Sequence, residues 1–550
     1  MKLFQKLLLA PAALGLLAPV AANAADVNLS GFSAYGTEEQ VTSITQFSDV
    51  QPTDWAYQAL SNLIERYGCV AGYPNGTYRG NRAMTRYEAA ALLNACLDRI
   101  TEVTDELKRL MKEFERELAV LRGRVDGLEA RVGELEATQF STTTKLRGQT
   151  TFVVGANSFS GTNDRAGDIA TANTAAFNKA NYGATTFNYD VRLNLDTSFT
   201  GKDLLRTTLR ADNFFNGNVN PSAYGVGLTF LEVATNAPSA DNVVEINRLF
   251  YNFPVGDSFS VTAGARVRID DAGMLGMWPS VYPADTVLDV FTYAGAAGAY
   301  NTSYGLGAGA GIVYSDVLGF DNWTLSTNYV SSNGGQGNAG LMTDASSSTS
   351  VTQLGYTGGK FPVIGGSAWG IAGAYNYSQN MALSIGTPYA NSMGATGSSN
   401  NFGLSGYWVP ENTGWIPSVS TGWGTTSFEN AGYRTDTNAK AQSWYVGLQW
   451  PDTFVKGNDL GMAVGQAPFV TNTGAGAYSD VNGGPKTPVD QNYAWEWWYK
   501  FQVTDNITVT PALYYINNYD GQYGKKNTSN GNYNASDSVF GGLLKTTFKF

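Results

Sequence analysis

The sequence contains no histidine and only two cysteines among its 550 residues. Histidine is the commonest general base and the commonest metal ligand near neutral pH, so its absence excludes serine–histidine and cysteine–histidine catalytic arrangements. The two cysteines, Cys69 and Cys96, are too few for a disulfide scaffold or a zinc ribbon. We therefore predict no catalytic residue, no metal site and no cofactor, and we do not expect an enzyme.

Charge is also scarce, since Asp, Glu, Lys and Arg make up only 15% of the chain and the formal net charge is −11. A negatively charged chain has no electrostatic support for binding nucleic acid, so no nucleic acid is expected among its partners. Aromatic residues reach 13%, and there are 63 glycines. This composition favours many short strands joined by polar turns.

Long hydrophobic runs are confined to the start of the chain. Two lysines precede an apolar stretch at 7–20, and an Ala-Asn-Ala sequence ends at position 24. This pattern predicts that residues 1–24 are a secretory signal peptide. No later apolar run reaches the roughly 18 residues of a transmembrane helix. If the exported chain spans a membrane, it must therefore do so as a closed β-barrel.

A compact helical module is predicted after a polar leader at 25–44. Within residues 45–100, apolar residues at helical spacing precede a turn cluster at 72–76, and Thr85 is placed to cap a second helix. Cys69 and Cys96 both fall inside this module. An oxidising compartment permits a disulfide between them, but free buried cysteine is also common, so their pairing stays open.

Residues 101–137 carry apolar residues at alternating spacings of three and four, with Glu, Arg and Lys between them. This heptad pattern is typical of a coiled coil. No single helix buries such a seam, so we expect this segment to associate with copies of itself. The alternative is a single amphipathic helix packed on the C-terminal barrel that is predicted below.

From residue 141 to the end, apolar and polar residues alternate with a period of two. The apolar rows are rich in Tyr, Trp and Phe, and the polar rows carry Arg and Asp in mid-strand, which a packed core would not tolerate. A soluble β-sandwich is the alternative, but its buried rows would be aliphatic. The pattern therefore predicts an all-β transmembrane antiparallel barrel of about 16 strands.

The predicted wall of the pore is rich in arginine. Arg206 and Arg210 share the polar face of one segment and Arg266 and Arg268 that of another, whereas the face of Arg248 is ambiguous because alternation slips there. The segment at 270–293 is too apolar for solvent, so we expect it to fold into the barrel as a constriction loop. The predicted lining residues are Arg192, Arg206, Arg210, Arg248, Arg266, Arg268, Asp270, Asp271, Asp285 and Asp289.

This arrangement predicts an arginine wall that faces acids of the loop across the narrowest point. The alternative is that the arginines only neutralise acids of the lumen. Glycines at 305, 307, 309 and 311 lie on one face of the next strand. Glycine on a lumen face leaves room for an inserted loop.

Four short motifs of the helical module resemble the S-layer homology (SLH) domain: Phe47-Ser48-Asp49-Val50, Trp55-Ala56, Gly72-Tyr73-Pro74-Asn75-Gly76 and Thr85-Arg86-Tyr87-Glu88. Members of that family bind cell-wall polysaccharide linked to peptidoglycan. The resemblance implies that such a polymer is bound by Trp55, Gly72, Tyr73, Thr85 and Arg86. Arg86 would pair with an anionic sugar substituent, which suits the bidentate geometry of guanidinium.

The order of signal peptide, SLH module, coiled coil and barrel resembles the SLH-bearing, Som-type porins of the cyanobacterial outer membrane, whose barrel is related to the carbohydrate-selective, OprB-like porins. The terminal Phe548 and Phe550 fit the end signal that barrel-assembly machinery recognises. The resemblance implies a homotrimer in outer-membrane lipid, with the module in the periplasm. It also implies a passive channel for small hydrophilic solutes and ions. A carbohydrate- or iron-selective channel and a mainly structural wall tether are the alternatives.

Overall fold

The computed structural model describes residues 43–54, 57–67, 70, 76–79, 143–162, 175–214, 224, 226–234, 242–283, 287–301, 305–394, 397–412, 414–429, 438–474, 487–525 and 534–550. Several predicted features lie outside these residues: the signal peptide, the coiled coil, Asp285, both cysteines, and Trp55, Gly72, Tyr73, Thr85 and Arg86. The chain divides into two compact units, Met1–Thr138 and Gln139–Phe550.

The N-terminal unit has a small helical core. A 3-10 turn η2 (Ile44–Gln46) precedes helix α4 (Tyr57–Asn62), which continues into the π-helical turn η3 (Leu63–Tyr67). The carboxylate of Asp49 accepts the backbone N–H groups of Tyr78 at 2.6 Å and Arg79 at 2.5 Å. These bonds join two parts of the chain that are far apart in sequence. The buried apolar side chains are Ile44, Phe47, Leu60, Ile64 and Val70.

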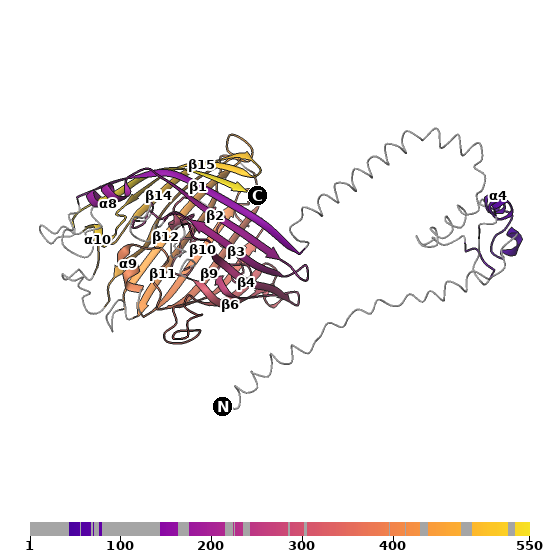
Figure 1. Ribbon diagram of the computed structural model, residues 1–550, viewed down its shortest axis with the longest axis horizontal. Coiled ribbons are helices and arrows are strands. Elements are labelled where there is room, and N and C mark those ends of the chain that lie inside the picture. Colours follow the sequence, from indigo (N-terminus) through magenta and orange to yellow (C-terminus); the bar gives the residue numbers. More distant parts are fainter. Residues whose placement is uncertain are drawn as a thin grey trace, which may run out of the picture. The chain divides into compact units, whose positions relative to one another are not determined.

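The C-terminal unit is a closed barrel of 16 antiparallel strands (Figure 1). Each strand pairs with the next along the chain, and β1 pairs with β16 to close the sheet. The predicted fold class and strand number are confirmed. The strands are β1 (Thr144–Gly161), β2 (Thr186–Thr197), β3 (Leu204–Asp212), β4 (Glu245–Val255), β5 (Phe259–Arg268), β6 (Leu306–Ser315), β7 (Trp323–Ser331), β8 (Ser348–Gly358), β9 (Ala368–Gln379), β10 (Ser398–Val409), β11 (Ser418–Glu429), β12 (Lys440–Pro451), β13 (Asp459–Asn472), β14 (Tyr493–Thr504), β15 (Ile507–Asn517) and β16 (Asp537–Lys549).

The connections between strands alternate between short and long. At one end, β4 joins β5 through 256–258, and β14 joins β15 through 505–506. At the other end, long connections carry the helices α8 (Ala175–Tyr182), α9 (Pro388–Gly394) and α10 (Gln522–Lys525). Outer-membrane barrels place short turns in the periplasm and long loops outside the cell. The short turns therefore mark the periplasmic end.

The seam between β1 and β16 closes at the C-terminus. The backbone N–H of Gly148 donates to the carbonyl of Phe550 at 2.6 Å, and the N–H of Phe550 donates back at 2.9 Å. Phe548 pairs with Thr150 and contacts the ring of Phe152 at a centroid distance of 6.0 Å. The two terminal phenylalanines thus belong to the last ladder that closes the barrel.

No helix in the described part of the chain is both long enough and apolar enough to cross a membrane.

Candidate constriction site inside the barrel

The connection between β5 and β6 turns inward and lies along the inner wall. The backbone N–H groups of Val281 and Tyr282 both donate to Ser420 Oγ on β11 at 3.0 Å. The carbonyl of Gly295 accepts Ser443 Oγ from β12 at 2.8 Å. We call residues 269–301 the inserted loop. Its position agrees with the expectation for 270–293, and it extends further, because Asn301 Nδ2 donates to the carbonyl of Ala382 at 2.9 Å.

Glycines on the inward faces of several strands make room for this loop. A Cβ atom added to Gly403 would lie 2.8 Å from Ala296 Cβ, one on Gly422 would lie 1.9 Å from the carbonyl oxygen of Ala294, and one on Gly447 would lie 2.7 Å from the ring of Tyr282. Any side chain would therefore push the loop off the wall. These positions, with Gly311 and Gly355, which face Met274 and Met277, form what we call the glycine track.

The predicted glycine row on β6 serves this purpose only in part. Gly305 and Gly311 face the loop, whereas a Cβ atom on Gly307 or Gly309 would meet backbone oxygens of β7, at 2.0 Å and 2.2 Å.

A buried carboxylate on β14 holds the middle of the inserted loop. Glu496 Oε1 accepts the hydroxyl of Tyr282 at 2.8 Å, and its Oε2 accepts the backbone N–H of Leu288 at 2.7 Å. Trp498 Nε1 donates to the same tyrosine oxygen at 2.9 Å. Because both oxygens of Glu496 bond to the loop, this side chain acts as a clamp between loop and wall.

A second segment, from the connection between β3 and β4, also enters the barrel. The N–H of Glu232 donates to the carbonyl of Val287 at 3.2 Å, and the N–H of Asp289 donates to the carbonyl of Phe230 at 3.0 Å. The bridge between Leu231 and Leu288 ties the two segments together. Sequence reasoning missed this segment, although the apolar run at 226–233 carries the same signal as 270–293.

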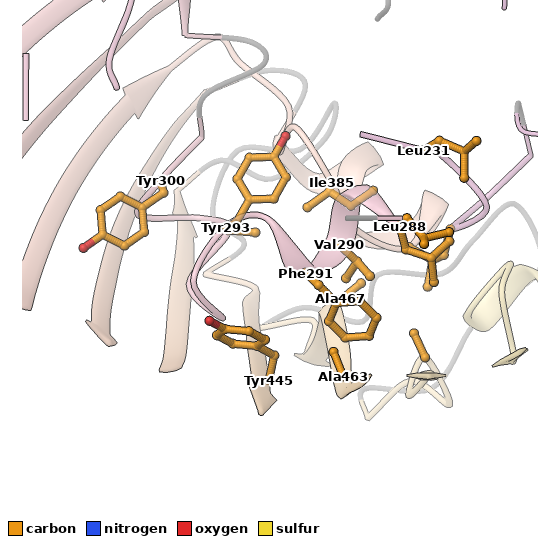
Figure 2. Packing of buried hydrophobic residues seen from close by; sticks show 14 of the residues in the cluster. Leu231, Leu288, Val290, Phe291, Tyr293, Tyr300, Ile385, Tyr445, Ala463 and Ala467 are labelled. Atoms are coloured by element: carbon orange, nitrogen blue, oxygen red, sulfur yellow. The ribbon is translucent and has the colours of Figure 1, made fainter. Parts of the chain in front are cut away.

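The two segments and the wall share a hydrophobic cluster inside the barrel (Figure 2). Phe291 and Ala467 lie close together in this view, and the ring of Phe291 lies 6.4 Å from that of Tyr445, centroid to centroid. The barrel interior is therefore partly a packed core, which fixes the loops in place. The labelled members are Leu231, Leu288, Val290, Phe291, Tyr293, Tyr300, Ile385, Tyr445, Ala463 and Ala467.

The opposite part of the wall, on β2 and β3, carries paired charges. Arg206 grips Asp196 with two bonds, Nε to Oδ1 at 2.7 Å and the terminal nitrogen to Oδ2 at 2.8 Å. Asp190 accepts Arg192 Nε at 2.6 Å and Arg210 Nε at 2.5 Å. This bidentate and shared geometry suits guanidinium–carboxylate pairs.

Two further pairs lie where β4 and β5 meet the inserted loop. Arg248 Nε lies 2.8 Å from Asp271 Oδ2, and Arg268 Nε donates to Asp270 Oδ1 at 2.6 Å. Asp289 accepts the hydroxyls of Thr292 at 3.1 Å and Tyr293 at 3.3 Å, both within the loop. The predicted acids of the loop that the structure describes, Asp270, Asp271 and Asp289, therefore do not form a separate row facing the arginines. Asp270 and Asp271 pair with them directly.

Bulges in β4 and β5 determine which face of the sheet two predicted pore residues, Arg248 and Arg266, occupy. Thr208 of β3 pairs with Arg248 and Leu209 with Ile246, so β4 carries one extra residue, Asn247. This bulge explains the slip in alternation around Arg248. A second shift, between Gly264 and Val267, places Val267 inward and buried and pairs Arg266 with the outward-facing Leu249. The prediction that Arg266 shares the inward row was therefore wrong, because a bulge moves a side chain to the other face.

The remaining arginines, Arg192, Arg206, Arg210, Arg248 and Arg268, form what we call the arginine wall. In two of its pairs the whole basic side chain is more exposed than the acid: the side chain of Arg192 is 25% exposed and that of Asp190 1%, and the values for Arg206 and Asp196 are 28% and 9%. The charges of the pairs nearly cancel, and the terminal Nη2 of Arg192 is itself buried. Within the described residues, no three His, Cys, Asp or Glu side chains could hold a metal.

Comparison with known families gives two matches. The family described as "Carbohydrate-selective porin, OprB family" matches residues 102–550, and "S-layer homology domain" matches residues 46–90. The chain belongs to the OprB porin family. It is thus an outer-membrane porin with an N-terminal SLH domain, and the predicted family, fold and location are confirmed.

Two relatives of this porin span almost the whole chain. The protein alr4550 of Nostoc sp. is 37% identical over 93% of this chain and 86% of its own length, and sll0772 of Synechocystis sp. is 32% identical over 93% and 91%. Outer membrane protein SlpA of Deinococcus radiodurans is 35% identical over 18% of this chain and 10% of its own length. The solved OprB of Pseudomonas putida covers 76% of this chain and 96% of that chain, with 13% identity and a TM-score of 0.46.

Proposed function

We propose that this porin is a passive diffusion channel for small hydrophilic solutes and inorganic ions. The observation that supports this most is the inserted loop, which hydrogen bonds and buried contacts hold against β11, β12 and β14. The inserted loop fills the side of the lumen at β11, β12 and β14. The segment at 226–234 contacts the arginine wall, through Val233 at Arg210 and Glu232 at Arg192. In this proposal solutes pass beside these contacts, along the rest of the arginine wall. Selectivity in such a pore depends on the charges at the constriction and not on the total charge.

Because the side chains of Arg192 and Arg206 are more exposed than those of their partner acids, the proposed channel has a weak preference for anions. Planar-bilayer recordings in a salt gradient test this through the reversal potential. An intact porin that gives no conductance at all would refute the channel proposal.

A substrate-selective channel for carbohydrate or iron is the second candidate, and the family description favours testing sugars first. Selective transport requires a binding site in the lumen. Block of the ion current by a sugar or a ferric chelate at micromolar to millimolar concentration would support this candidate, and the absence of block would argue for simple diffusion. Liposome swelling with a graded series of sugars measures the size limit directly.

We further propose that the SLH domain tethers the porin to peptidoglycan-linked polysaccharide through Trp55, Gly72, Tyr73, Thr85 and Arg86. In this proposal the heptad segment at 101–137 forms a trimer, so three single SLH domains act together. Deletion of residues 45–137 should abolish pull-down by purified cell wall and leave conductance intact. If wall binding persists, the tether lies elsewhere, and a monomeric mass for the detergent-solubilised protein would end the trimer proposal.

The last strand supplies a further proposal, that barrel-assembly machinery recognises Phe548 and Phe550. Removing both residues should reduce the amount of assembled barrel in cells more than it reduces refolding in detergent.

A further inference from the structure

Four consecutive turns at the periplasmic end carry large apolar side chains that nothing in the barrel covers. They join β6 to β7, β8 to β9, β10 to β11 and β12 to β13. One side chain in each is almost fully exposed: Leu318 80%, Val363 85%, Trp415 97% and Phe454 89%. We call these four connections the apolar turns.

The apolar turns occupy one arc of the rim, because β6 to β13 are consecutive in the closed barrel. The flanking turns differ. Residues 256–258 read Gly-Asp-Ser and residues 505–506 read Asp-Asn. The remaining short turn, between β2 and β3, has an exposed Phe199, whose ring lies 6.3 Å from that of Tyr251. The four large side chains are therefore a feature of one side of the barrel.

These turns are continuous with the aromatic residues on the outer face of the barrel. Trp450 Nε1 donates to the carbonyl of Trp415 at 2.9 Å. The ring of Phe454 lies 6.1 Å from that of Tyr499, and the ring of Phe361, in the β8–β9 turn, lies 5.0 Å from that of Trp369. Alternation places these partners on the outward row, so the apolar turns extend the surface that faces lipid and not the lumen.

Charged residues accompany the apolar ones. Lys360 and Glu411, on neighbouring apolar turns, form an ion pair at 3.0 Å, and both side chains are largely exposed. A surface that combines exposed aromatic and aliphatic side chains with paired charges fits the boundary between acyl chains and headgroups. Exposed apolar patches of this kind would be costly in water.

We propose that the apolar turns insert into the inner leaflet of the outer membrane at the level of the headgroups. Lipid thus anchors the β6–β13 side of the barrel from the periplasmic end, while the turns at 256–258 and 505–506 stay in water. The partner is a phospholipid surface, and this inference does not depend on what the channel transports.

The barrel has no cysteine of its own, which allows single labels. In full-length protein carrying Cys69→Ser and Cys96→Ser, a spin label is placed at Trp415→Cys or Val363→Cys, with Asn506→Cys as the matched control on the same rim. Proteins are reconstituted in phosphatidylcholine–phosphatidylglycerol vesicles. We expect oxygen collisions to dominate at 415 and 363 and collisions with a water-soluble nickel chelate to dominate at 506. Equal accessibility to the nickel chelate at 415 and 506 would overturn the proposal.

Protection of position 415 from both reagents would also overturn it, because protein would then cover the turn: a second copy, or the N-terminal unit of this chain. A second measurement leaves the cysteines unchanged. The fluorescence lost in Trp415→Phe reports Trp415 alone, and brominated acyl chains should quench it. Quenching by iodide instead would contradict insertion.

Discussion

Two parts of the inner wall of the barrel, β2 to β5 and β6 to β12, carry different kinds of side chain. On β2 to β5 the inward rows hold long charged residues, such as Arg192 and Arg206, paired with carboxylates. From β6 to β12 they hold mostly small or uncharged polar residues, and Ser420 and Ser443 bond to the backbone of the inserted loop. One part of the wall of this porin therefore lines the channel, and another part holds the inserted loop. Charged pairs are found in the part that lines the channel, and small residues in the part that holds the loop.

Filling the glycine track should have the largest effect on this division. Gly422→Val places a side chain where the carbonyl of Ala294 lies. Overpacking of this kind costs about 1–3 kcal/mol or more. When samples are heated to graded temperatures before gel electrophoresis, we expect the band of the folded barrel to disappear at a lower temperature than for the unsubstituted protein. Gly373→Val on β9 is the control, because nothing lies within 4 Å of its added Cβ. Equal stability of both variants would contradict the claim that the glycine track makes room for the inserted loop.

Removing the clamp residue Glu496 should have the next largest effect. Glu496→Ala removes the acceptors of the Tyr282 hydroxyl and the Leu288 N–H, each worth about 1–3 kcal/mol when left unsatisfied in a buried place. The loop should then leave the wall part of the time. We expect noisier single-channel currents and passage of larger sugars in liposome swelling. Glu429→Ala is the control, since its partners Ser398 and Asn400 lie at the extracellular rim. Unchanged currents for Glu496→Ala would argue against a clamp.

Removing charge from the arginine wall should have a smaller effect. Arg206→Gln removes the close partner of Asp196, and Arg192→Gln leaves Asp190 with Arg210 alone, so the lumen becomes more negative. One unit charge at 4 Å is worth about 1 kcal/mol in water, so the permeability ratio should shift severalfold at most toward cations. The measurement is the reversal potential in a salt gradient. Lys360→Gln, on an exposed turn, should leave the reversal potential unchanged. An equal shift in that variant would contradict the claim that the arginine wall sets the ion selectivity.

The smallest expected effect concerns the extracellular loops. Burial raises the pKa of Asp490 to about 7, although Thr387 Oγ1 and the N–H groups of Val470 and Gln522 donate to it. The folded protein therefore holds this proton more tightly than the unfolded chain, whose ordinary value is 3.8. Stability is full below about pH 4 and falls as the pH rises toward 7.

Asp490→Asn should remove that pH dependence from the hydrogen exchange of α9 and α10. An exchange profile that keeps the same slope between pH 4 and 7 would show that another group is responsible.

Much of this architecture follows from local patterns. Period-two alternation predicts the strands, and the apolar character of 270–293 predicts that it enters the barrel. Bulges are different, because one extra residue depends on the neighbouring strand and moves a side chain to the other face. Alternation alone therefore put Arg266 in the inward row. The glycines of β10 to β12 are equally ambiguous in sequence, since a strand glycine indicates a bulge, a bend or a close approach.

Solutes are expected to pass along the arginine wall and not along the inserted loop. A charged, water-soluble thiol reagent tests this most directly, when it is applied to open channels of cysteine-free protein with one new cysteine. At Asn194→Cys, between Asp190 and Asp196 on the inward row of β2, the reagent should reduce the current within the recording. At Ser443→Cys, whose hydroxyl donates to the loop at Gly295, the current should stay unchanged. Equal block at both positions would contradict the account.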